Sequence, residues 1–160
     1  LAGGAWRPVL DDPAASDGAR SVIRMVLCSG KLYYDLLAEA EKAGGDRPAL
    51  VRLEQLYSFP WAEMREVLAR YGALEELVWA QEEPRNMGAW SFVEPKLREL
   101  APEGVTLSYV GRPERASPAE GYPAAHAAEQ GRIIREALQM GGRPGEETLP
   151  TVAAAGEAKG

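Results

Sequence analysis

The stretch SVIRMVLCSGKLYYDLLAEA, at residues 21–40, decides the fold class of this chain. Residues 21–29 form a run of branched and apolar side chains bounded by Gly18 and Gly30, which is typical of a buried β-strand. Apolar side chains then recur at the spacing of a helix face, at Leu32, Leu36, Leu37 and Ala40. The pair Gly44 and Gly45 ends this predicted helix. A buried strand followed directly by an amphipathic helix is the first half of a βαβ unit.

The same order of strand and helix continues along the chain. Further strands are predicted at residues 49–56, 77–81 and 105–110, and further helices at 60–72, 86–100 and 124–138. We expect Asn86 to cap the second of these helices and Pro95 to kink it or to shift its start. The alternation predicts an α/β domain with a mostly parallel sheet and helices on both faces.

The domain organisation follows from where this alternation starts and stops. Residues 1–20 are rich in turn formers and are predicted to be a lead-in arm that adds an edge strand to the sheet. Residues 21–138 form the predicted α/β domain. Residues 139–160 are rich in Gly, Pro, Ala and Glu with few large apolar residues, so we expect a disordered tail.

Composition excludes several classes of protein. The 160 residues, 46% hydrophobic, fit one soluble domain, and the net charge of −6 argues against a nucleic-acid partner. No apolar run approaches the ~20 residues of a membrane helix, so no membrane partner is expected. The opening LAGGAWRPVLDD lacks the basic and apolar parts of a secretory signal. The start at Leu1 instead of Met predicts a fragment or a processed protein.

The chain has one cysteine, Cys28, and one histidine, His126. These counts exclude an intrachain disulfide and any zinc site built from several cysteines or histidines. We expect Cys28 to lie in the core and His126, near Glu129 and Gln130, to be a structural hydrogen-bonding histidine. The tryptophans are expected in the core or at an interface, at Trp6, Trp61, Trp79 and Trp90.

Candidate binding residues follow from a rule for open α/β sheets, whose ligands lie beyond the carboxyl ends of the strands. The rule selects residues 28–31, 54–60, 81–88 and 111–121. Ser29 and Lys31 flank a predicted helix start, where anions are favoured. The other interpretation is that Gly30 turns the chain and Ser29 caps the helix. The pattern GxxxxGK[ST] is absent, so a Walker nucleotide site is not supported.

Three charged groups have two interpretations each. Arg52 and Glu54 share one face of a predicted strand, which indicates either an ion pair or a face that meets a partner domain or ligand. Glu82 and Glu83 are adjacent carboxylates, which suggests acid–base chemistry. Neighbouring residues of a strand point to opposite faces, however, which favours one exposed carboxylate and one that binds a backbone group or an arginine. The third group comprises Arg112, Arg115 and Ser117. It is predicted either to bind phosphate or carboxylate through the paired N–H groups of its guanidinium side chains, or to dock on a neighbouring subunit.

Four stretches, in order and without large gaps, resemble the C-terminal domain of the decarboxylating component of 2-oxoglutarate dehydrogenase. They are VLCSGKLYYDLL at 26–37, LVRLEQLYSFP at 50–60, VWAQEEPRNMGAW at 78–90 and YVGRPERASPAEGY at 109–122. The last predicted helix, with His126, Glu129 and Gln130, fits as well. The resemblance covers roughly residues 5–138, and departs from the family at Met87, where Gln is usual, and at Pro95.

The resemblance implies a transketolase C-terminal-domain-like fold, with three α/β/α layers and a mostly parallel five-stranded sheet. It also implies a parent enzyme of the tricarboxylic acid cycle that uses thiamine diphosphate and magnesium to decarboxylate 2-oxoglutarate. The parent passes the succinyl group to a lipoyl arm on the dihydrolipoyl succinyltransferase core. Such a domain contacts the upstream catalytic domains and the second subunit of a homodimer, in the bacterial cytoplasm or in the mitochondrial matrix of a eukaryote.

The family's cofactor motif, GDG followed by an Asn, has no match in this chain. We therefore expect no catalytic and no metal-binding residue here, and no decarboxylation by this chain alone. Some members carry a regulatory acetyl-CoA or AMP site, which is the alternative function. Strand-end position and charge nominate Ser29, Lys31, Arg52, Arg112 and Arg115 for that site as a hypothesis.

Overall fold

The computed structural model describes residues 6–15, 21–44, 47–116 and 123–139. The strands are β1 (Val9–Leu10), β2 (Arg24–Cys28), β3 (Ala49–Leu53), β4 (Glu76–Pro84) and β5 (Thr106–Arg112). The helices are α1 (Leu32–Ala43), α2 (Trp61–Leu68), α3 (Trp90–Leu100) and α4 (Pro123–Leu138), with a short 3-10 turn at Pro13–Ala15. No helix among these residues is long and apolar enough to cross a membrane.

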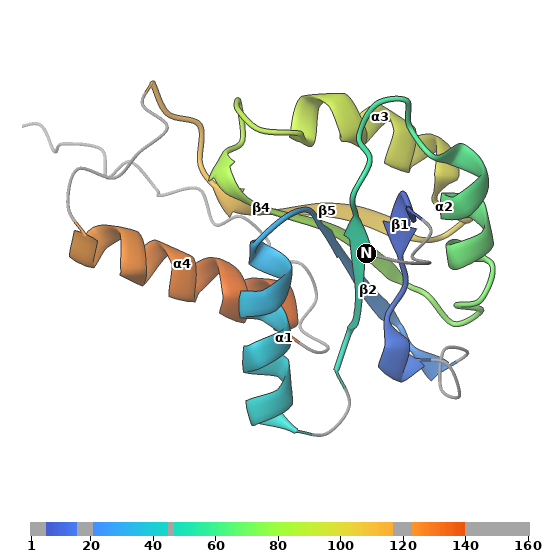
Figure 1. Cartoon of the computed structure of the whole chain (residues 1–160), viewed down its shortest axis with the longest axis horizontal. Helices are drawn as coiled ribbons and strands as arrows, with labels where there is room; N and C mark the ends of the chain where they lie inside the picture. The colour runs from blue at the N-terminus through green and yellow to red at the C-terminus, as the bar shows by residue number, and fades with distance from the viewer. Residues whose placement is uncertain (1–5, 16–20, 45–46, 117–122, 140–160) are drawn as a thin grey trace, which may run out of the picture.

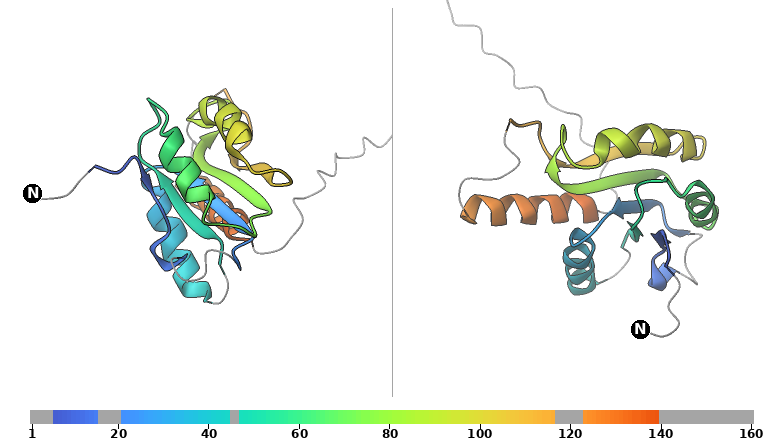
Figure 2. Two further views of the ribbon diagram at one scale, coloured as in Figure 1. Left: turned by 90° about the vertical axis from the view of Figure 1, so that its right-hand side faces the viewer. Right: turned by 45° about the horizontal axis from the view of Figure 1, so that its top comes forward.

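The strands form one sheet in the order β1-β3-β2-β4-β5. Strands β3, β2, β4 and β5 are parallel to one another, and only β1 runs antiparallel, against β3. Helices α1 and α4 cover one face of the sheet, and α2 and α3 cover the other (Figures 1 and 2). The predicted three-layer α/β/α fold and its edge strand from the first 20 residues are therefore confirmed.

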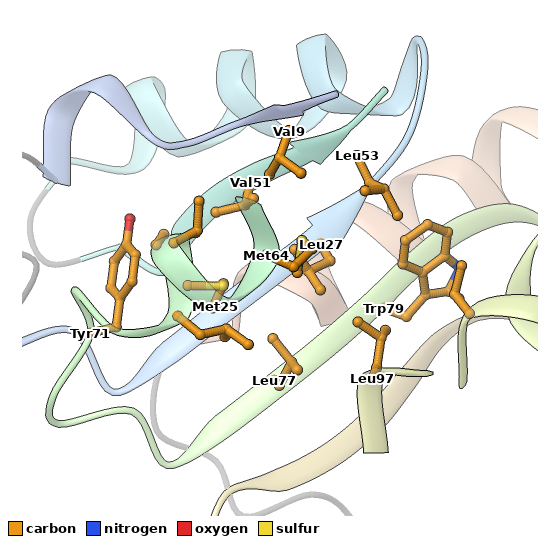
Figure 3. Packing of buried hydrophobic residues seen from close by; sticks show 14 of the residues in the cluster. Val9, Met25, Leu27, Val51, Leu53, Met64, Tyr71, Leu77, Trp79 and Leu97 are labelled. Carbon is orange, nitrogen blue, oxygen red and sulfur yellow. The ribbon is translucent and has the colours of Figure 1, made fainter. Parts of the chain in front are cut away.

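Side chains of the central strand β2 point alternately to the two faces of the sheet, and a hydrophobic core lies on each face. Met25 and Leu27 of β2 face α2 and α3, whereas Val26 and Cys28 face α1 and α4. Every residue of β2 is buried, which explains the apolar run at residues 25–28; the first residue, Arg24, forms a salt bridge with Glu76. Figure 3 shows the first cluster, with Trp79 and the other labelled side chains packed between the sheet and the helices.

A buried carboxylate ties the lead-in arm to the sheet. Asp12 pairs with both terminal nitrogens of Arg47 and accepts the backbone N–H groups of Leu50, at 2.8 Å, and Ala14, at 2.9 Å. Burial alone would raise the pKa of Asp12, but these hydrogen bonds and the Arg47 charge outweigh it and hold the pKa below its ordinary value. The arm is thus fixed beside β3.

Several predicted boundaries were wrong, for local reasons. Strand β4 continues to Pro84, three residues past the predicted end at Gln81, because its last part pairs with β5 after an irregularity between Ala80 and Pro84. Residues 54–56 lie outside β3, and β2 is shorter than the predicted 21–29. Helix α3 begins at Trp90 and runs through Pro95, so Pro95 does not set its start.

Two predicted helix caps were also wrong. No side chain caps α3: Asn86 instead holds the backbone of Arg115, accepting its N–H at 3.1 Å and donating to its carbonyl at 2.9 Å. Lys31, and not Ser29, occupies the cap position of α1, again without a side-chain bond. Gly30 does turn the chain there, with φ of +63°.

Candidate functional site

The parallel strands bring their carboxyl ends to one edge of the sheet. Strands β2, β3, β4 and β5 end there at Cys28, Leu53, Pro84 and Arg112. Of the five residues nominated from the sequence, Ser29, Lys31 and Arg115 lie in the connections that follow these strands, whereas Arg52 and Arg112 belong to the last residues of β3 and β5. We call this side of the domain the carboxyl edge, and it is the place where open α/β sheets bind ligands.

Lys31 and Arg52 already have partners within the domain. The Lys31 ammonium donates to the Asp35 carboxylate at 2.8 Å, and this bond raises the pKa of Lys31. Arg52 pairs with Glu54, which confirms the ion-pair interpretation. Its guanidinium also lies over Tyr33 and Tyr34, 4.8 and 5.2 Å from the two ring centres.

Arg112 is a buried residue of β5, and not a loop residue as predicted. Its terminal nitrogen lies 2.9 Å from Nδ1 of His126. Because a guanidinium only donates, Nδ1 is the acceptor of this hydrogen bond. This bond confirms His126 as a hydrogen-bonding histidine. Arg115 is exposed beyond the strand, and Ser117 lies outside the described residues.

Gln81 organises the carboxyl edge; it opens the selected stretch 81–88 but was not among the five nominated residues. Its side-chain oxygen accepts the indole N–H of Trp79 at 2.9 Å and the backbone N–H of Trp90 at 3.1 Å. Its side-chain nitrogen lies within hydrogen-bond distance of three carbonyls, the shortest being Met87 at 2.8 Å; the others belong to Glu83 and Pro84. One buried amide thus joins β4, the following turn and the start of α3.

The turn that Gln81 organises also places the other residues singled out in this region. Met87 contributes its carbonyl to Gln81, and its side chain is half-buried. The Glu83 side chain is exposed and Glu82 is half-buried. The Glu83 carbonyl lies within hydrogen-bond distance of both the Gln81 amide and the Tyr109 hydroxyl. This backbone role, and not a carboxylate pair, is what the structure gives Glu83.

An apolar hollow of about 360 Å³ lies at the carboxyl edge beside Gln81. Its walls are mainly Leu56, Tyr57, Trp79, Ala89 and Phe92, with polar contributions from Ser29, Gln81 and Glu83. Tyr57 is 87% exposed at its rim. Walls of this kind accept an apolar side chain or ligand.

Further aromatic side chains are exposed close to the strand ends. Tyr34, in the first turn of α1, is 58% exposed, and Trp6 is 69% exposed. The Trp6 indole donates to Gln55, which places it beside the loop that carries Tyr57. The other tryptophans agree with the predicted core role: Trp79 and Trp90 are buried and Trp61 is partly buried.

A second hollow, of about 400 Å³, lies between the end of β5 and α4. We call it the arginine hollow, because Arg85, Arg112 and Arg132 line it together with Tyr109, Gly111, Pro113 and Glu129. Ser29 lines the apolar hollow and Arg112 the arginine hollow, whereas Lys31, Arg52 and Arg115 line neither. The five nominated residues therefore do not share one cavity.

The described residues contain little that resembles a catalytic set. Cys28 is buried, and burial raises the pKa of its thiol to about 12, so the thiolate needed for nucleophilic attack is scarce at neutral pH. The predicted core role of Cys28 is confirmed. Within the described ranges, no group of three or more His, Cys, Asp or Glu residues fits a metal ion.

The fold places this domain in a known structural class. A solved structure described as a split gene transketolase, inactive beta4 tetramer, matches it with a TM-score of 0.51 and 22% identity, over 72% of this chain and 39% of that one. The class is therefore the transketolase C-terminal-like α/β domain, here with a carboxyl edge that carries two hollows.

The particular family is identified by sequence. The model of the 2-oxoglutarate dehydrogenase C-terminal family matches residues 1–138, and the chain belongs to that family. The 2-oxoglutarate dehydrogenase E1 components of Geobacillus kaustophilus and Bacillus subtilis are 52% and 44% identical to it, over 84% and 83% of this chain. The chain spans only 14% of the length of each of these relatives. The resemblance given by the four sequence stretches is confirmed.

Proposed function

We propose that this chain is a docking domain of a 2-oxoglutarate dehydrogenase E1 component, and that its carboxyl edge binds the remaining part of that enzyme. The observation that carries the proposal is the apolar hollow with the exposed Tyr57 at its rim. The proposed occupant of this hollow is the rest of the E1 component. In the matched relative, that remaining part is 86% of the length, because this chain spans 14%.

The chemistry of the carboxyl edge suits a protein partner. Aromatic residues are enriched at protein interfaces, and each covers ~150–250 Å² when buried. Tyr57, Tyr34 and Trp6 are exposed near the strand ends, whereas the hollow beside them has an apolar floor made by Trp79 and Phe92. Covering these groups removes apolar surface from water, which is the main driving force of association.

In the whole enzyme, we propose the following division of labour. Thiamine diphosphate and magnesium, held by the upstream domains, support decarboxylation of 2-oxoglutarate, and the succinyl group passes to the dihydrolipoyl succinyltransferase core. This domain positions those catalytic domains across a homodimer and carries no reacting group itself. The enzyme acts in the cytoplasm of a bacterium, as its bacterial relatives suggest.

The regulatory alternative stays a prediction. An acetyl-CoA or AMP site at Ser29, Lys31, Arg52, Arg112 and Arg115 has weaker support, because these residues lie apart and Lys31 and Arg52 have internal partners. The observation in its favour is that Arg112 lines a hollow rich in arginine. Titration of the chain with acetyl-CoA and AMP tests it, and absence of binding for both removes it.

A chimeric enzyme tests the docking role. Residues 1–138 replace the matching segment of the Geobacillus kaustophilus E1 component, with deletion of the segment as the reference. We expect the chimera to assemble and to decarboxylate 2-oxoglutarate. Tyr57→Asp is expected to reduce assembly at least tenfold, because it puts a charge at the rim of the hollow.

The matched control is Ile23→Asp. Ile23 is also an exposed apolar residue, but it precedes β2 and therefore lies at the amino end of the sheet. Both substitutions add a charge at an exposed site, so both are expected to leave the stability of the isolated chain within about 0.5 kcal/mol. Equal assembly of the two chimeric variants contradicts the proposed docking surface.

A further inference from the structure

Strand β5 forms an open edge of the sheet. It is the outermost strand on the side opposite β1, and among the described residues it pairs with β4 alone. The two edges differ in length, because β1 has two residues and β5 has seven. An open edge strand presents a row of backbone N–H and C=O groups that can pair with another strand.

The register with β4 decides which backbone groups of β5 point outward. The N–H of Thr106 donates to the carbonyl of Glu75 at 2.9 Å, so Thr106 directs its backbone groups toward β4. Successive residues of a strand direct these groups to opposite sides, so Leu107 and Tyr109 direct theirs away from β4. Within the described part of the chain, no hydrogen bond uses the backbone N–H or C=O of Leu107 or Tyr109.

The outward row ends at Gly111. The guanidinium of Arg132, on α4, donates to the Gly111 carbonyl at 2.9 Å, as the same alternation requires of an outward-facing residue. Arg132 thus covers the carboxyl end of the edge and leaves the stretch from Leu107 to Tyr109 open. A segment that pairs with this stretch is centred on Ser108.

The sequence of β5 lacks two features that usually prevent an edge from pairing. Natural edge strands are often protected by charged side chains, especially lysine, and by proline. Residues 106–111, TLSYVG, contain no charged residue and no proline. The side chains of Leu107, Ser108 and Tyr109 are partly exposed, so this part of the edge is accessible.

The Tyr109 side chain is held in a fixed position. Its ring packs against that of Trp90, with ring centres 5.1 Å apart, and its hydroxyl lies 3.2 Å from the carbonyls of Glu83 and Arg112. A Cβ atom at Gly111 would collide with this hydroxyl, so glycine allows the ring to lie across the end of β5. A side chain that is already ordered loses little conformational entropy when a partner binds.

The open stretch of β5 is complementary to a second copy of itself. In an antiparallel pair with its two-fold axis at Ser108, Leu107 of each copy lies opposite Tyr109 of the other. The two residues then exchange both of their N–H···O bonds, so every outward backbone group of this stretch gains a partner in both copies. The pair also joins an aliphatic and an aromatic side chain, which is a favourable combination across strands.

The charges at the two ends of β5 favour the same orientation. The connection before β5, residues 101–105, carries Glu103 and no basic residue, whereas residues 112–116 carry two arginines and one glutamate. Antiparallel pairing places the acidic end of each copy beside the basic end of the other. A parallel arrangement would bring like charges together, and charge complementarity of this kind selects one orientation.

We propose that β5 is a self-association edge, at which two copies of this chain pair antiparallel about Ser108 and join their sheets into one. The occupant is a second copy because Leu107 and Tyr109 complement each other in that register and because the two ends of the strand differ in charge. This edge is separate from the proposed docking surface, since no residue of β5 lines the apolar hollow.

An engineered cysteine at the two-fold axis tests the pairing. In the proposed pair the two copies of residue 108 lie opposite each other, with Cα atoms about 4.5 Å apart, which is within the range of a disulfide. Ser108→Cys is therefore expected to give a covalent dimer of the full 160-residue chain on oxidation with copper–phenanthroline. The native Cys28 is buried and the pKa of its thiol is about 12, so it contributes little background.

Thr106→Cys is the matched control. Thr106 lies on the same strand and the same face as Ser108 and is more exposed. Its two copies lie two residues on either side of the axis, about 14 Å apart, which is too far for a disulfide. We expect cross-linking at residue 108 to be at least about tenfold faster than at residue 106. Equal rates, or no covalent dimer of Ser108→Cys, overturn the proposal.

The unsubstituted chain provides a second measurement. Sedimentation velocity over a range of concentrations is expected to show a reversible equilibrium of monomer and dimer. The amides of Leu107 and Tyr109 are expected to exchange with deuterium more slowly as the dimer forms. A chain that stays monomeric at every concentration overturns the proposal. Protection of these two amides in the monomer also overturns it, because another segment of the same chain then covers the edge.

Self-association and docking can fail separately. Tyr57→Asp is expected to weaken assembly of the chimeric enzyme and to leave disulfide formation at residue 108 unchanged, because Tyr57 lines the apolar hollow and β5 does not. Loss of the cross-link in a chain that carries both Tyr57→Asp and Ser108→Cys would place the self-association at the docking surface and overturn the assignment to β5.

Discussion

Replacing Gln81 by Leu is expected to be one of the most damaging single changes at the carboxyl edge. The amide oxygen accepts two buried donors, the Trp79 indole N–H and the Trp90 backbone N–H. Leu has a similar size but offers no acceptor, so both donors stay buried without a partner. Each such donor costs about 1–3 kcal/mol, which predicts a loss of about 2–6 kcal/mol in the free energy of unfolding.

Urea denaturation, followed by tryptophan fluorescence, measures this loss. Trp79 and Trp90 are the partners of Gln81, so their emission reports on the same turn. A loss of 3 kcal/mol corresponds to a fall in Tm of about 10 °C for a domain of this size. Gln81→Glu keeps the oxygen that accepts both N–H groups, but it places a second, charged oxygen against the carbonyls of Glu83, Pro84 and Met87, so we expect a loss that is no smaller than that of Gln81→Leu.

Gln55 provides the matched control. Its side-chain oxygen also accepts a tryptophan indole N–H, that of Trp6, but at an exposed site where water can replace the bond. Gln55→Leu is therefore expected to change the free energy of unfolding by less than about 1 kcal/mol. If Gln81→Leu costs no more than Gln55→Leu, the central role given to Gln81 is refuted.

Three further predictions concern other parts of the domain. Asp12→Asn removes the charge that pairs with Arg47, so it should destabilise the fold by about 3 kcal/mol at pH 7, as measured by urea denaturation. Folding lowers the pKa of Asp12, so its contribution to the free energy of unfolding is present above the unfolded pKa of about 4 and is lost as the pH falls through the folded pKa. The Asn variant should lack this loss of stability in acid. Parallel curves of stability against pH for the two proteins would contradict this explanation. Gly111→Ala should destabilise the domain by at least about 1 kcal/mol in thermal unfolding, since Tyr109 must move, and an unchanged Tm would show that the close approach is unimportant. Alkylation of Cys28 by iodoacetamide at pH 8 should require unfolding, because the thiol is buried with a pKa of about 12, and rapid labelling of the native chain would disprove this.

The layers of the fold follow from local sequence patterns. The apolar run at residues 25–28 of β2 predicts a strand buried on both faces, and the spacing from Leu32 to Ala40 predicts the helix that covers one of them. The parallel sheet then fixes which connections reach the carboxyl edge. Cys28 was placed correctly because an apolar strand end leaves no room for solvent around the thiol.

The site depends on contacts that local patterns do not contain. Gln81 follows an apolar run and looks like the end of a strand. The available signal was Trp79, whose indole N–H needs an acceptor when it is buried. Asn86 looked like a helix cap, but its amide reaches Arg115 from another loop. Arg85, Arg112 and Arg132 meet only because α4 packs beside β5, so their cluster requires the tertiary structure.

Hydrogen–deuterium exchange tests the central claim most directly. The isolated chain is compared with the chimeric E1 component that carries it, peptide by peptide. The docking role predicts that assembly protects the loop at residues 54–60 and the start of α3, which border the apolar hollow, and leaves the exposed face of α2 unchanged. Identical exchange at residues 54–60 in the two proteins would contradict it.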